Sequence, residues 1–120
     1  MKKLLLLILL VLTLCSYVTI GYGQDLPSAD AAMGFFVKAH DKGVVKWGFE
    51  APSMVFSVEP MFWNRMTHEE KQNFCKLALS VVTDLREKGA KNLMNFWVLD
   101  MTSGSKLAVG RIYGKIDIYK

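Results

Sequence analysis

Residues 67–89, THEEKQNFCKLALSVVTDLREKG, decide the fold of this chain. They open with a capping box, in which the Thr67 hydroxyl accepts from the Glu70 amide and the Glu70 carboxylate accepts from the Thr67 amide. Apolar side chains then recur every three or four residues and form one continuous helical face, at Phe74, Leu77, Ala78, Val81, Val82 and Leu85. Because Gly89 is a natural helix stop, we predict a long helix over about residues 68–88.

Two segments before this helix have the periodicity of strands. In residues 44–50 every second side chain is apolar, at Val45, Trp47 and Phe49. In residues 53–59 the same alternation places Met54, Phe56 and Val58 on one face. Since only Ala51-Pro52 lies between the two segments, we predict an antiparallel hairpin that buries one face and exposes the other.

Residues 28–42 allow two interpretations. Ser28 is a suitable N-cap for a helix that ends before Gly43. The apolar face of that helix would hold Ala32, Phe35, Phe36 and Ala39. The alternative is a strand through Phe35-Phe36-Val37 that turns at Asp41-Lys42-Gly43. We favour the helix.

The C-terminal third returns to strand patterns. Residues 93–99 are apolar on both faces, which is typical of a central strand. Residues 100–105 form a turn cluster, residues 106–113 pair back, and a last short strand follows a bend at Gly114. We therefore predict an α+β domain, in which an antiparallel sheet of four to five strands packs against one long helix, with a second helix on the N-terminal side.

The first 24 residues are typical of an export signal. Lys2 and Lys3 precede the apolar run Leu4–Leu12, and no further charge occurs before Asp25. We predict an exported protein that is periplasmic or secreted.

Small residues in Gly21-Tyr22-Gly23 mark a candidate cleavage site, which predicts a signal peptide over 1–23 and one domain over 24–120. Two alternatives stay open. Residues 4–24 are about long enough to cross a bilayer, and would then anchor the domain in the inner membrane. Cys15 could carry a lipid, although Leu14 stands where a small residue is usual in lipoproteins.

Charge and length bound the exported domain. The 120-residue chain has a net charge of +4, and Lys2 and Lys3 supply half of it. Basic and acidic residues alternate elsewhere, without the one-sided basic patch of nucleic-acid binders, so we expect no nucleic-acid partner. The 97 residues left after cleavage (120 minus 23) can bury one core without disulfides or metal. Cys75 is predicted to be a buried thiol, with an intermolecular disulfide as the alternative.

The polar residues predict neither a catalytic site nor a metal or cofactor site. His68 lacks a metal-binding partner one helical turn away, because Gln72 occupies that position. Asp100 is expected to stabilise its own turn. An enzymatic site would require the fold to bring together residues that are distant in sequence. The candidate residues are Asp100, His68, His40 and Ser103.

Met61, Phe62 and Trp63 form a candidate interaction patch. They lie in the connection between the second strand and the long helix. Aromatic residues and Met are enriched at protein interfaces, so an exposed cluster here could dock a partner. The alternative is that Trp63 closes one end of the core.

Three short motifs resemble small exported bacterial proteins of uncharacterised function. They are the segment Val58–Trp63, the helix that bears Thr67 and Lys71, and the hairpin that ends in Leu107-Ala108. The resemblance covers roughly residues 44–113. It implies the fold and the compartment, and it brings no catalytic residue.

The sequence as a whole favours an exported, non-enzymatic domain that binds a protein or a cell-envelope component. The alternatives are a membrane-tethered accessory subunit, which requires residues 4–24 to remain attached, and a small envelope enzyme. The sequence does not specify an oligomeric state.

Overall fold

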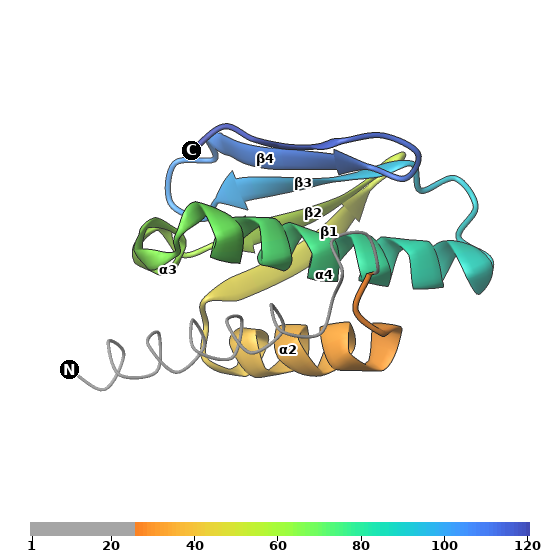
Figure 1. The fold of residues 1–120 in the computed structure, drawn as a ribbon, viewed down its shortest axis with the longest axis horizontal. Helices are drawn as coiled ribbons and strands as arrows, with labels where there is room; N and C mark the ends of the chain where they lie inside the picture. The colour runs from red at the N-terminus through yellow and green to blue at the C-terminus, as the bar shows by residue number, and fades with distance from the viewer. Residues whose placement is uncertain (1–25) are drawn as a thin grey trace.

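A computed structural model of the protein describes residues 26–120 (Figure 1). Three helices and five strands follow one another in the order α2 (Ala29–Asp41), β1 (Val45–Glu50), β2 (Ser53–Val58), α3 (Pro60–Arg65), α4 (His68–Glu87), β3 (Asn95–Asp100), β4 (Lys106–Arg111) and β5 (Ile116–Ile118). The α+β fold predicted from the sequence is confirmed, including the long helix and the second helix before the hairpin.

The five strands form one sheet in the order β1-β2-β3-β4-β5. Three of the four neighbouring pairs are antiparallel, and β2 pairs with β3 in parallel. The sequence analysis expected a wholly antiparallel sheet. The parallel pair has a simple cause: α3 and α4 carry the chain back along the sheet between β2 and β3, as parallel neighbours require.

Both long helices cover the same face of the sheet (Figure 1). Helix α4 contacts β3, β4 and β5, and α2 contacts β1 and α4. The inner face of the sheet meets them with Val45, Met54, Phe56 and Val58 of the hairpin and with Phe96 and Val98 of β3. Burial of the predicted face is incomplete in β1, where Trp47 is partly buried and Phe49 is exposed. The largest fully buried side chains are aromatic and include Trp63, Phe35, Phe36, Phe56, Phe62, Phe74 and Phe96.

Helix α4 has the ends that its sequence predicts. Thr67 Oγ1 accepts from the Glu70 amide at 3.1 Å, and the Glu70 carboxylate accepts from the Thr67 amide at 2.9 Å. At the other end, Lys88 pairs with Asp84 at 2.9 Å, and Gly89 takes a positive φ of 124°. This conformation suits glycine and ends the helix.

Residues 28–42 are helical, so the strand alternative for this segment was wrong. The Ser28 side chain accepts from the Ala31 amide at 3.1 Å and caps α2. Its buried residues are the predicted ones, Ala32, Phe35, Phe36 and Ala39. Gly43 follows with a φ of 74° and lets the chain turn into β1.

The connection after β2 contains a helix that the sequence analysis did not predict. Glu59 caps it, because its carboxylate accepts from the Phe62 amide at 2.9 Å. Pro60 occupies the first turn of α3, where its fixed φ suits a helix and its missing N–H costs no hydrogen bond. Pro60 therefore both ends the strand and begins the helix.

The predicted signal peptide, its anchor and lipoprotein alternatives, and Cys15 all lie outside the described residues. Among residues 26–120, no helix is long and apolar enough to span a bilayer.

Candidate functional site

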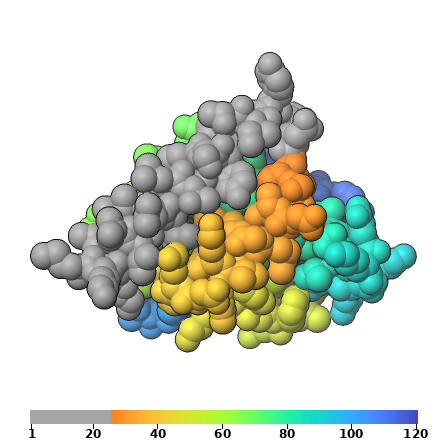
Figure 2. All heavy atoms as spheres, turned by 90° about the horizontal axis from the view of Figure 1, so that it is seen from below, coloured from red at the N-terminus to blue at the C-terminus, as the bar shows by residue number. Residues whose placement is uncertain are grey.

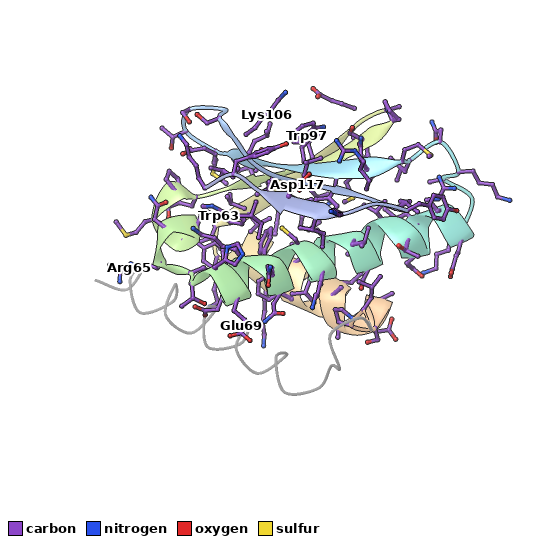
Figure 3. The ribbon with its side chains drawn as sticks, turned by 45° about the horizontal axis from the view of Figure 1, so that its top comes forward. Trp63, Arg65, Glu69, Trp97, Lys106 and Asp117 are labelled. Atoms are coloured by element: carbon purple, nitrogen blue, oxygen red, sulfur yellow. The ribbon has the colours of Figure 1, made fainter. Side chains whose placement is uncertain are left out.

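The predicted patch at residues 61–63 divides between the core and the surface. Phe62 and Trp63 are fully buried, whereas Met61 is 50% exposed. One side of the short helix α3 faces the core and the other faces the solvent. Phe62 and Trp63 are on the core side and Met61 is on the solvent side, so the three residues do not form one exposed patch. Trp63 lies in the core at the α3 end of the molecule (Figure 3), in accord with the alternative role of closing that end.

The surroundings of Trp63 explain its burial. Its ring packs edge-on against Phe74 of α4, with ring centroids 5.6 Å apart. Lys71 covers it from outside, with Nζ 5.4 Å from the ring centroid, and the same Nζ donates to the Lys120 carbonyl at 2.5 Å. The Trp63 Nε1 finds no hydrogen-bond partner among the described residues. This end of the molecule is thus closed by its own side chains.

The four polar residues considered as enzyme material do not assemble into a site. The Asp100 carboxylate accepts from the Thr102 and Ser103 amides, at 2.7 and 3.1 Å, and stabilises an exposed turn as predicted. His68 lies 3.3 Å from the Gln72 side chain at the start of α4. His40 stacks beside Trp47, with centroids 5.1 Å apart, at the end of α2. His40 and His68 lie in different helices, and Asp100 and Ser103 share only the exposed turn after β3.

Residues 26–120 contain no cluster of three metal-binding side chains. Cys75 is a free, fully buried thiol. Burial raises the pKa of its thiol to about 12, which keeps it protonated and unreactive at neutral pH. The predicted buried thiol is confirmed.

Charged side chains lie over part of the helix-free face of the sheet. Trp97 points to this face, and Lys106 Nζ lies 4.5 Å above its ring centroid (Figure 3). Arg111 and Asp117 pair at 3.7 Å nearby. The ring of Trp97 is therefore already in contact with a cation from β4.

An apolar pocket lies on the opposite face, at the β1 side of the sheet. Its volume is about 110 Å³, and its lining comes from α2, α4 and the hairpin: Met33, Phe36, Trp47, Phe49, Met54, Phe56, Val81 and Leu85. The sequence analysis did not predict it. The pocket lies between α2 and α4 toward the turn end of the hairpin, where Phe49 pairs with Met54.

Large apolar side chains are exposed around this pocket. Phe49 is 60% exposed at the end of β1, and Met33 and Val37 are exposed one helical turn apart on α2. Figure 2 shows α2 in orange beside the yellow hairpin on this face. We call Met33, Val37 and Phe49 the edge surface. The alternation in β1 predicted that Phe49 faces the helices, but not that it lies at the edge of the sheet.

Comparison of the chain with protein-family models, with curated proteins and with solved structures finds no match. The functional argument therefore rests on the geometry.

Proposed function

We propose that this protein is an exported, non-enzymatic domain that binds another protein through the edge surface. The observation that carries the proposal is the exposure of Met33 and Phe49 where they line an apolar pocket, with exposed Val37 one helical turn from Met33 on α2. Scattered apolar residues are normal on protein surfaces, but grouped ones around a concavity are typical of interaction sites.

The size of the pocket favours a protein partner over a small molecule. Sites for drug-sized ligands have volumes of about 300–1,000 Å³, and this pocket has about 110 Å³. It has room for one apolar side chain. Its lining residues are almost all apolar, so it lacks the convergent polar groups that orient a small ligand.

The export signal in residues 1–23 supports a location outside the cytoplasm. If residues 4–24 remained attached, the same edge surface would serve a membrane-tethered accessory subunit. An enzymatic role has less support, because His40, His68 and Asp100 each have a structural task in a separate element.

Site-specific photo-crosslinking in intact cells tests this proposal. A photoreactive amino acid at position 49 should form an adduct of defined mass, because Phe49 lies in the edge surface. Position 61 is the matched control, since Met61 is similarly exposed at the opposite end of the molecule. No adduct at position 49, or equal adducts at both positions, would refute the proposed surface.

A further inference from the structure

Strand β1 presents unpaired main-chain groups along one side. In the described part of the chain it is an edge strand, with β2 as its only neighbour. The Glu59 amide donates to the Val44 carbonyl at 2.9 Å, and bonded pairs alternate along an antiparallel ladder. The main-chain groups of Gly48 therefore face β2, and those of Trp47 and Phe49 face outward. This is the arrangement that accepts an added strand.

Two opposite charges flank Gly48 on the helix-free face of β1. Lys46 and Glu50 are both exposed, and neither forms an ion pair within residues 26–120. Nothing in residues 26–120 requires a glycine at position 48. Its φ is not positive, and an added Cβ would meet nothing within 4 Å. Glycine inside a strand often marks the close approach of another backbone.

We propose that the partner of the edge surface is a second copy of this chain, which adds its own β1 antiparallel to β1 about a two-fold axis at Gly48. This inference rests on the proposed function and names the partner of the same surface. In this register Trp47 lies opposite Phe49 of the second copy, and their outward main-chain groups bond to each other. The two sheets become one continuous sheet.

The charges on β1 are self-complementary only in this register. Lys46 lies opposite Glu50 of the second copy, and Glu50 lies opposite Lys46 of the second copy, so two cross-strand ion pairs form around the axis. Opposite charges directly across a ladder are stabilising, and like charges are destabilising. Gly48 leaves the space between the two pairs empty.

The other elements of the molecule are consistent with this choice of edge. Strand β5, at the far edge of the sheet, has only three residues, and short edge strands resist pairing. Helix α2 packs on β1, so the two-fold axis brings the α2 helices of both copies to the same face. The exposed Met33, which lines the pocket with Trp47 and Phe49 of β1, then lies on the face that the second copy approaches.

Disulfide trapping tests the register. The exported protein, purified from cells that express the full chain with Cys15→Ser, would carry either Gly48→Cys or Lys46→Cys. Two residues at position 48 face each other at a Cα separation of about 4.5 Å, within the range that a disulfide bridges. Residues at position 46 lie four residues apart along the ladder, about 13 Å, which is beyond that range.

Under mild oxidation we expect a covalent dimer with Gly48→Cys and none with Lys46→Cys. Circular dichroism confirms that both variants fold, and the open space around Gly48 makes the substitution tolerable. No dimer with Gly48→Cys, or equal dimer formation by both variants, would overturn the proposal. The crosslink at position 49 distinguishes failure of this inference from failure of the proposed function. An adduct with a different protein would support binding through the edge surface and would reject the second copy as the partner. The absence of an adduct would reject both.

Discussion

Gly110 and Gly48 occupy two strands of the same sheet, and their surroundings differ. A Cβ added at Gly110 would lie 2.5 Å from Cζ of Phe96, so the ring of a core residue requires that glycine. A Cβ added at Gly48 would meet nothing. The first glycine is explained by the packing of its own chain. Nothing in residues 26–120 accounts for the second, and the strand that we propose to join β1 would approach it there.

The same difference extends to the regions around the two glycines. On the Gly110 side, α4 covers the sheet, and Arg86 donates to the carbonyls of Lys91 and Leu93 and so holds the loop before β3. On the Gly48 side, β1 is the edge strand of the sheet, and Phe49 near its end is exposed to solvent. One side of the sheet is packed by its own chain, and the other is the side where we propose that the partner binds.

The largest effect should come from Trp63 in the closed region. Trp63→Ala removes a fully buried indole and should lower the free energy of unfolding by about 3–5 kcal/mol. Met61→Ala, in the same helix but exposed, should change it by less than about 0.5 kcal/mol. Urea denaturation measures both. Equal effects would show that Trp63 is not part of the core.

The two glycines can be compared directly by the same substitution. Gly110→Ala should destabilise the protein by about 1–3 kcal/mol, because Phe96 is buried and cannot move aside freely. Gly48→Ala should be neutral or stabilising by up to about 1 kcal/mol, since alanine restricts the unfolded chain more than glycine does. Thermal unfolding at low protein concentration measures both. A loss at Gly48 that matches the loss at Gly110 would contradict the contrast.

Cys75 gives a smaller, pH-dependent effect in the core. Its pKa is about 12 in the folded protein and about 9 when unfolded, so the unfolded state loses its proton first as the pH rises. Stability is unaffected well below pH 9 and falls as the pH rises through 9 toward 12. The loss at pH 10 should be roughly 1.4 kcal/mol.

The control for this prediction is Cys75→Ala. That variant should lack this part of the alkaline loss, while the contributions of lysines and tyrosines remain. Urea denaturation at pH 8 and pH 10 gives the difference. An identical pH dependence in the two proteins would show that the thiol is not shielded from solvent.

Local signals made much of the fold predictable. Thr67, Glu70 and Gly89 mark the ends of α4, because capping depends on residues close together in sequence. The alternation around Phe56 identified the inner face of the hairpin, since successive side chains in a strand point to opposite faces. Helix α3 was missed because Pro60 reads equally well as the end of a strand.

The candidate site could not be predicted in the same way. It depends on the order of the strands: β2 pairs with β1 on one side and with β3 on the other, and no strand of residues 26–120 pairs with the far side of β1. No residue in β1 records that position. The sequence shows the spacing of Lys46, Gly48 and Glu50. That spacing can be interpreted only once β1 is known to be an edge strand.

The most direct test of the central claim is the mass of the exported protein in solution, with charges exchanged on β1. Sedimentation equilibrium should show a dimer for the native chain. Lys46→Glu places like charges opposite each other twice and should weaken the dimer about tenfold or more. Lys46→Glu combined with Glu50→Lys restores both pairs and should restore the dimer. A native chain that stays monomeric, or three proteins with the same dissociation constant, would contradict the account.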